Sequence, residues 1–271
     1  MTISPKPLTI VGILNVTPDS FSDGNQFLDT QVAIDKGREL IARGADMVDI
    51  GAESSNPDGQ KISAKEEIDR LTPVIKALKE EGIKISIDTY KPEVMEQVIP
   101  LGVDMINDVT GLRDPAAIAV IKKTDVPVVI MFARNEGPHA DRTMRDHTTV
   151  MSELDEFFTG QIKLLRESGI PQGKIIIDPG MGLFLGGGPE PSLMVLRHFE
   201  ELGKFGCDMY LSASRKSFIG AVLDRPIKQR GIGTLTTEIW AWQHGASYIR
   251  THEPEPLRDA VRMIRAIEQI E

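Results

Sequence analysis

The chain has 271 residues, a formal net charge of −9 and a hydrophobic fraction of 41%, which suits one large globular domain and argues against a nucleic-acid binder with a basic face. No apolar run approaches the ~18 residues that span a membrane, and Met1–Pro7 is too short and too polar for a signal peptide. We therefore expect a cytoplasmic protein without nucleic-acid or membrane partners, and its single cysteine, Cys207, excludes an intrachain disulfide.

Short apolar runs that end in polar residues recur along the whole chain. The eight runs are Leu8–Leu14, Met47–Ala52, Ile83–Ile87, Met105–Ile106, Val126–Met131, Ile175–Ile177, Met209–Leu211 and Tyr248–Ile249. Nearly continuous apolar strands that alternate with helices are typical of a parallel sheet. Eight such units in a chain of this length predict an α/β protein, a single (β/α)8 TIM barrel domain over residues 1–271.

The stretches between the runs have the periodicity of amphipathic helices. After the second run, Ser63 and Glu66 form a capping box ahead of a clear apolar stripe. Pro73 lies inside this helix and is expected to kink it. A second stripe, Val150–Leu165, includes two phenylalanines that we interpret as core residues.

Chemistry-bearing side chains follow the predicted strands, at the end where such barrels place their active sites. They are two acids, two amides, two cations and a histidine: Asp88, Asp178, Asn15, Asn107, Lys216, Arg250 and His252. A carboxylate can accept two parallel hydrogen bonds from the edge of a planar, amidine-like ligand, and Asn107 can add a donor and an acceptor. Lys216 and Arg250 would meet carbonyl or phosphate oxygens.

Taken singly, several of these residues have a plainer interpretation. Asp88 could cap the next helix, Asp178 could belong to a turn with Pro179 and Gly180, and Lys216 could be part of a solvated pair of cations. Arg250 and His252 alternate at a strand end and so face one side. It is the combination that favours a ligand site.

Metal and phosphate motifs are sparse. The five histidines form no i, i+4 pair, which argues against structural zinc, whereas Mg²⁺ needs only one or two protein oxygens besides substrate phosphates, and Asn15 could supply one. Two glycine-rich stretches, 135–147 and 182–188, are candidate mobile loops over the barrel mouth. The second continues into Pro189 rather than a lysine, which excludes a P-loop.

Six motifs occur in order and extend over almost the whole chain. They are NVTPDSFSDG at 15–24, SIDTY at 86–90, NDV at 107–109, DPGMG at 178–182, SRKSFIG at 214–220 and RTH at 250–252. Together they resemble dihydropteroate synthases. The resemblance implies a (β/α)8 barrel that joins 6-hydroxymethyl-7,8-dihydropterin diphosphate to p-aminobenzoate with Mg²⁺, releases diphosphate, and forms a homodimer.

The resemblance also implies a role for each motif. Asp178, Asn107 and Lys216 would hold the pterin ring, with Asp88 at its far edge. Asn15 would meet Mg²⁺ or the diphosphate, which Arg250 and His252 would bind. Phe21 and Asp23 would be catalytic residues in a first loop that closes over the reacting centre. The remaining implied substrate contacts are Ser55 in a second loop near p-aminobenzoate, Met131 and Phe184.

Three departures from the family pattern stand out. Asn56 replaces an arginine of the usual ESTRPG sequence, Met131-Phe132-Ala133 stands where MHM is frequent, and residues 181–186 lack the usual lysine. These features resemble the plasmid-borne, sulfonamide-insensitive branch of the family. Leu183, Phe184 and Leu185 are therefore predicted to narrow the aminobenzoate entrance, although they could instead face the core.

Two alternatives to the synthase stay open at this stage. Methyltetrahydrofolate-binding barrels of corrinoid methyltransferases share a pterin site, but SRKSFIG and RTH argue against them. A pterin-binding paralogue without synthase activity would be consistent with Asn56.

Overall fold

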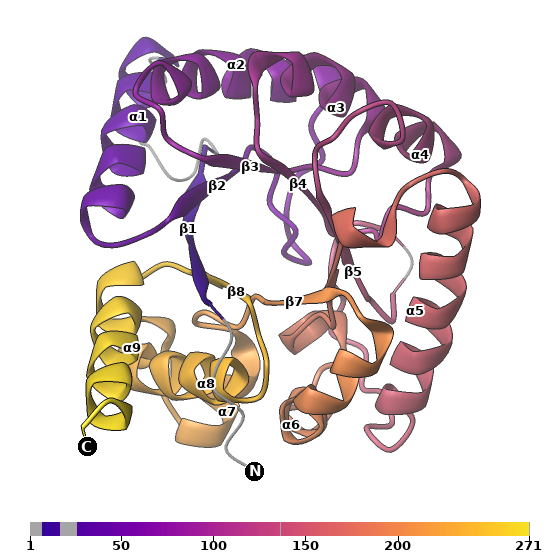
Figure 1. Cartoon of the computed structure of the whole chain (residues 1–271), viewed down its shortest axis with the longest axis vertical. Helices are drawn as coiled ribbons and strands as arrows, with labels where there is room; N and C mark the ends of the chain where they lie inside the picture. The colour runs from indigo at the N-terminus through magenta and orange to yellow at the C-terminus, as the bar shows by residue number, and fades with distance from the viewer. Residues whose placement is uncertain (1–6, 17–25, 136, 271) are drawn as a thin grey trace.

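A computed structural model of the chain describes residues 7–16, 26–135 and 137–270. Eight parallel strands close into a barrel in chain order, with β1 beside β8 (Figure 1). The strands are β1 (Thr9–Asn15), β2 (Met47–Gly51), β3 (Ile85–Asp88), β4 (Met105–Asp108), β5 (Val128–Met131), β6 (Ile175–Asp178), β7 (Asp208–Leu211) and β8 (Tyr248–Thr251). The predicted (β/α)8 barrel is confirmed.

Helices surround this barrel as an outer ring (Figure 1). They are α1 (Gln26–Ala42), α2 (Ala64–Glu80), α3 (Pro92–Val98), α4 (Pro115–Ile121), α5 (Val150–Glu167), α6 (Glu190–Arg197), α7 (Ser217–Leu223), α8 (Gly231–Gln243) and α9 (Pro254–Glu268). Within the part of the chain that the structure covers, no helix has the length and apolar character needed to cross a membrane.

The predicted local signals explain where individual helices begin and what they bury. The Ser63 hydroxyl accepts a hydrogen bond from the Glu66 amide at the start of α2, as the capping box predicted. The helix continues through Pro73 to Glu80, and a kink at this proline stays a prediction. Phe158 on α5 is completely buried and Phe157 packs against the same core, which confirms both as core residues.

Of the three apolar clusters among the described residues, two hold the barrel together. The larger one fills the space between strands and helices. The smaller one comes from alternate strand positions, which point into the barrel, and consists of Val11, Met47, Met105, Val129, Ile176, Tyr210 and Tyr248. Two residues further along, most of the inward positions are polar, as at Asp49, Asn107, Asp178 and Arg250, whereas Met131 of β5 is apolar. This arrangement places a layer of hydrogen-bonding groups on an apolar floor.

Candidate active site

The polar strand ends predicted from the sequence meet inside the carboxyl end of the barrel. Strand pairing sets Asp88 of β3 beside Asn107 of β4, and Met131 of β5 beside Asp178 of β6. Asn107 and Asp178 are 4% and 2% exposed. Buried polar groups of this kind need partners from the protein or from a ligand.

Arg250 reaches from β8 to two carboxylates on neighbouring strands. Its Nε donates to Asp49 Oδ2 at 2.6 Å, and its Nη2 donates to Asp88 Oδ2 at 3.0 Å. The same Asp49 oxygen accepts a hydrogen bond from Asn107 Nδ2 at 3.2 Å. Burial tends to lower the pKa of Arg250, but the carboxylates of Asp49 and Asp88 outweigh it and the pKa is raised. Arg250 therefore stays charged and anchors this side of the site.

Asp49 is a site residue that the sequence did not single out. It lies in the middle of the apolar run of β2 and is completely buried. Its Oδ1 atom has no hydrogen-bond partner among the described residues. An acid inside a buried strand was the available signal, because such a charge requires a partner.

Asp178 of β6 and Lys216, which follows β7, form a second charged group next to Arg250 of β8. Asp178 Oδ1 accepts from the Gly180 amide at 2.8 Å, and Lys216 Nζ donates to the Met181 carbonyl at 3.2 Å. Burial raises the pKa of Asp178 to about 6, against the opposing effect of Lys216. Burial lowers the pKa of Lys216 to about 8, although Asp178 favours its charge. Both groups are thus poorly solvated and suited to a ligand with complementary donors and acceptors.

Burial also raises the pKa of Asp88, and the attraction of Arg250 only partly offsets this effect. The barrel mouth therefore holds acids whose charges are costly without a ligand. A ring rich in N–H groups would stabilise these carboxylates by donating hydrogen bonds to their oxygens.

His252 lies just beyond β8 and is held by Ser214. The two side chains approach within 2.9 Å between His252 Nδ1 and Ser214 Oγ, and the same hydroxyl accepts from the His252 amide at 3.2 Å. Burial, followed by the nearby charges of Arg250 and Arg215, lowers the pKa of His252 to about 3. The imidazole is consequently neutral at physiological pH.

The other predicted residues have different placements. Asn15 ends β1 and is exposed, Met131 ends β5 and is buried, and Phe184 is buried in the turn after β6. Phe21 and Asp23 lie outside the described residues. The chemistry of the first loop therefore stays a prediction.

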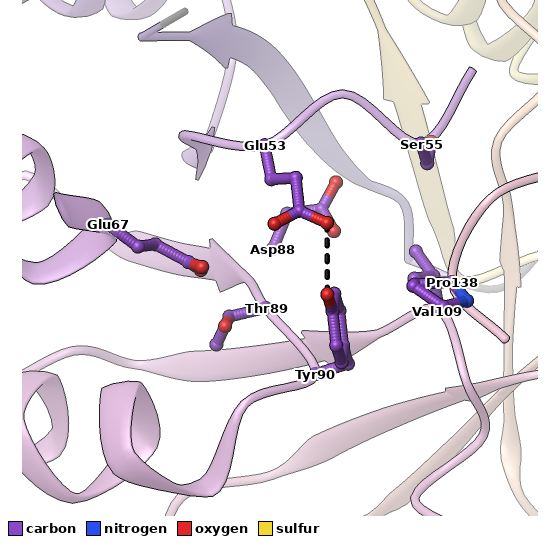
Figure 2. A pocket seen from close by; sticks show the side chains of 8 residues that line it. All are labelled: Glu53, Ser55, Glu67, Asp88, Thr89, Tyr90, Val109 and Pro138. Atoms are coloured by element: carbon purple, nitrogen blue, oxygen red, sulfur yellow. Dashed lines mark hydrogen bonds between the residues drawn. The ribbon is translucent and has the colours of Figure 1, made fainter. Parts of the chain in front are cut away.

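Ser55 helps to line a small pocket beside Asp88 (Figure 2). In this pocket the Tyr90 hydroxyl donates to Glu53 at 3.0 Å, shown by the dashed line in Figure 2. Lys91 lies close by, with its Nζ 2.6 Å from carboxylate oxygens of both Glu53 and Glu67. This ion-paired group was not predicted, because its members come from three separate segments.

The described residues at the barrel mouth offer a metal ion few protein ligands. Across residues 7–16, 26–135 and 137–270, no three His, Cys, Asp or Glu side chains are grouped to hold an ion. The exposed carboxamide of Asn15 can offer a single oxygen. This donor set suits Mg²⁺ that brings most of its ligands from substrate phosphates and water.

Comparison with known proteins identifies the family. Residues 11–252 match the family described as pterin binding enzyme. The chain is 43% identical over 259 residues to dihydropteroate synthase type-3 of Escherichia coli, covering 95% of this chain and 98% of that protein. The chain belongs to the dihydropteroate synthase family. The resemblance read from the six motifs is confirmed.

Further relatives of the dihydropteroate synthase family agree. The type-2 enzyme of Escherichia coli is 42% identical over 265 residues, with 97% of each chain covered. The Clostridium difficile enzyme solved with pteroic acid has a TM-score of 0.88 and 39% identity, over 99% of this chain and 100% of that chain. The Xanthomonas albilineans enzyme solved with 4-aminobenzoic acid has a TM-score of 0.88 and 33% identity, and the match covers 98% of this chain and 95% of that chain.

Proposed function

We propose that this chain carries out the dihydropteroate synthase reaction with the residues grouped at its barrel mouth. The reaction joins 6-hydroxymethyl-7,8-dihydropterin diphosphate to p-aminobenzoate and releases diphosphate. The observation that carries the proposal is the pair of buried Asp178 and half-buried Lys216, next to the Arg250 network. Together they match a flat ring with N–H donors on one edge and a carbonyl on another.

Asp178 would accept from two N–H groups of the pterin, while Lys216 would donate to ring acceptors. Asn107 and Asp88 would contact the remaining ring edge. Since Asn107 and Asp88 are both tied to Arg250 or Asp49, their orientation is set before the ligand arrives. Such preorganisation lowers the cost of ordering the site on binding.

The chemical step needs no protein nucleophile. The bond between the pterin methylene carbon and the diphosphate oxygen breaks, and its electron pair leaves with the diphosphate. The amine nitrogen of p-aminobenzoate bonds to that carbon and then loses a proton. The protein assists by orienting the two reactants and by stabilising the leaving anion.

His252 and Ser214 would contact the leaving diphosphate through hydrogen bonds. Mg²⁺, when bound with the diphosphate and Asn15, supplies positive charge that offsets the developing negative charge. Binding of the anion would also favour protonation of His252, because an adjacent negative charge raises a histidine pKa.

Incubation of the purified protein with Mg²⁺ and both substrates tests this function. We expect release of diphosphate together with formation of 7,8-dihydropteroate. Binding of pterin without product would instead support a paralogue that lacks synthase activity. Failure to bind pterin at all would contradict both interpretations.

Reduced sensitivity to sulfonamides is a further part of the proposal. Phe184 packs with Met131 and Ala133 at the mouth, and Lys216 Nζ lies 5.3 Å from the centre of its ring. Half-buried Leu183 joins the same cluster. Leu185, in contrast, is completely buried in the main core, so the expectation that it narrows the entrance is wrong. Its apolar side chain packs with the residues between strands and helices instead of lining the mouth.

The Phe184 ring can exclude a bulky ligand because it lies beside Lys216 at the barrel mouth and occupies part of the space there. A sulfonamide has a tetrahedral sulfur and often a second ring, whereas p-aminobenzoate ends in a flat carboxylate. A sulfonamide affinity about a hundredfold below that of p-aminobenzoate requires a difference in binding free energy of only about 2.8 kcal/mol. We expect sulfamethoxazole to inhibit the native enzyme weakly and Phe184→Gly more strongly, measured at fixed p-aminobenzoate. Equal and strong inhibition of both proteins would contradict this role.

Homodimer formation is also proposed. Exposed apolar side chains lie on consecutive elements of one side, α7, the following turn and α8: Val222, Leu223, Ile227, Ile232 and Trp240. Exposed apolar side chains on two helices that pack against each other favour a protein–protein contact.

A further inference from the structure

The loop that carries Phe184 is held from below by one arginine, Arg134. The Arg134 amide donates to the Phe184 carbonyl at 3.0 Å, and its Nη1 donates to the Leu185 carbonyl at 3.2 Å. The same residue thus binds two consecutive carbonyls of the loop. Arg134 lies three residues beyond the end of β5, while the loop follows β6, so these bonds join the segments after two neighbouring strands.

Arg134 is itself firmly held. Its side chain is only 4% exposed. Nε donates to Glu153 Oε2 at 2.7 Å, and Nη2 contacts the other oxygen of this carboxylate and donates to the Thr149 hydroxyl at 2.6 Å. A forked contact with a carboxylate fixes the plane of a guanidinium group. Arg134 therefore connects the start of α5 rigidly to the Phe184 loop.

The side chains of the two residues whose carbonyls Arg134 binds, Phe184 and Leu185, pack in different clusters. Phe184 belongs to the small cluster at the mouth, whereas Leu185 is buried in the main core. A rotation of the backbone between them would move the Phe184 ring away from Lys216. The bonds from Arg134 resist that rotation.

The opposite side of the loop is covered by the segment 142–145. The Gly187 amide donates to the Thr143 carbonyl at 2.9 Å. A Cβ atom at Gly187 would lie 2.7 Å from the Arg142 carbonyl oxygen, and Gly186 adopts a φ of +146°. The glycine run is thus required by close backbone packing. With Arg134 on one side and this segment on the other, the loop is confined.

We propose that Arg134 is a positioning residue that sets the selectivity of the site between p-aminobenzoate and larger aryl sulfonamides. It does so by holding the Phe184 ring at the mouth beside Lys216. This inference rests on the proposed function. Without the forked contact the loop can yield to a larger ligand, so exclusion weakens while the pterin side, built from Asp178 and the Arg250 network, is unaffected.

The test compares Arg134→Ala and Arg134→Lys with the native enzyme. The measured quantity is the inhibition constant of sulfamethoxazole divided by the KM of p-aminobenzoate, together with the Kd of a pterin carboxylic acid. We expect the ratio to fall about tenfold or more in Arg134→Ala, equivalent to about 1.4 kcal/mol. The ratio should fall less in Arg134→Lys, because lysine keeps the positive charge beside Glu153 but cannot make the two-pronged contact with its carboxylate. The pterin Kd should stay within about twofold, well under 1 kcal/mol.

Two further variants separate positioning from general damage. Glu153→Gln keeps the shape but removes the carboxylate charge, and should give an intermediate ratio. Arg38→Ala removes an arginine that pairs with Glu81 between α1 and the end of α2, far from the mouth, and should leave the ratio unchanged. If Arg134→Ala does not fold, Arg134→Lys and Glu153→Gln still carry the test.

The outcomes are distinct. An unchanged ratio in the Arg134 and Glu153 variants, or a fall matched by an equal loss of pterin affinity, overturns the positioning role. A low ratio in the native enzyme overturns both the proposed insensitivity and this role. Absence of native turnover contradicts the synthase function alone, and the ratio is then obtained from calorimetric binding of the two ligands in the presence of pterin and diphosphate.

Discussion

Burial moves the pKa values of Asp178 and Lys216 toward each other, to about 6 and about 8. The two groups are both charged only between these values in the free protein. A pterin that donates to Asp178 and accepts from Lys216 favours the charged form of each. Binding should therefore release a proton below this window and take one up above it.

The first prediction concerns the pH dependence of pterin binding. Affinity should fall as the pH drops through about 6, because Asp178 becomes protonated, and fall again above about 8, because Lys216 loses its proton. Calorimetry with a pterin carboxylic acid measures both limbs. Asp178→Asn serves as the control. It should bind more weakly by on the order of 2–5 kcal/mol and keep only the part of the acidic limb that comes from Asp88, whose pKa is also raised by burial.

Affinity that stays constant between about pH 5 and pH 7 in the native protein would contradict this assignment. So would an Asp178→Asn variant whose affinity changes less than about threefold, which is under 1 kcal/mol.

The second prediction concerns Asp49. Removing it in Asp49→Ala leaves Arg250 and Asn107 without their shared acceptor. Breaking a buried ion pair costs about 3–5 kcal/mol, which corresponds to a fall in melting temperature of roughly 10 °C for a domain of this size. Asp49→Asn retains an acceptor oxygen and should lose less. Thermal unfolding checks both variants.

The matched control is Asp58→Asn. Asp58 also pairs with an arginine, Arg142, but its side chain is 78% exposed, so the melting temperature should hardly change. A similar effect at both positions would argue against a special role of Asp49.

At the residue scale, the sequence predicted the members of the site better than their partners. Asp88, Asn107, Asp178 and Arg250 could be found because polar residues interrupt apolar runs at strand ends. The bond from Arg250 to Asp49 joins residues 201 positions apart, and no local pattern indicates it. The pairing depends on closure of the barrel between β8, β1 and β2.

At the scale of elements, the predicted strands were correct but several ended too early. The apolar runs stop at Ile87, Ile106 and Ile177, whereas β3, β4 and β6 extend to Asp88, Asp108 and Asp178. Hydropathy locates buried side chains, but the backbone ladder continues through polar residues that face the interior. Asp88, Asn107, Asp178 and Arg250 therefore belong to the strands themselves, whereas Lys216 and His252 lie in the segments that follow β7 and β8.

The third prediction concerns the end of β8, where Arg250 and His252 were both expected to bind diphosphate. Because Arg250 is paired with Asp49 and Asp88, Arg250→Ala should weaken binding of pterin with and without diphosphate. His252→Ala should weaken mainly the diphosphate-bearing ligand, since His252 contacts Ser214 at the rim. Paired calorimetric titrations with the two ligands separate these effects.

Equal losses for both ligands in His252→Ala would place His252 with the ring or the fold. A purely diphosphate-specific loss in Arg250→Ala would mean that its pairing with the carboxylates is given up on binding.

At the scale of the whole molecule, β1 and β8 lie side by side, and α9 packs near β1 (Figure 1). The barrel is thus closed only when the first and last strands meet. A single domain over residues 1–271 stays a prediction, and one cooperative unfolding transition is its expected signature.

The last prediction concerns assembly. Ile232 on α8 is 84% exposed and Val222 on α7 is 54% exposed, although α7 and α8 pack closely, with Ile219 and Leu223 of α7 against Gly233 of α8. Leaving such side chains in water forgoes the stabilisation that burial would give them, so a second copy of the chain is the expected partner of this face.

Ile232→Glu should convert a dimer to a monomer in sedimentation equilibrium, because a buried unpaired charge is costly. Val32→Glu is the matched control, since Val32 is 48% exposed on α1, on another side of the barrel (Figure 1). A native protein that sediments as a monomer, or a dimer that survives Ile232→Glu but not Val32→Glu, would show that this face is not the interface.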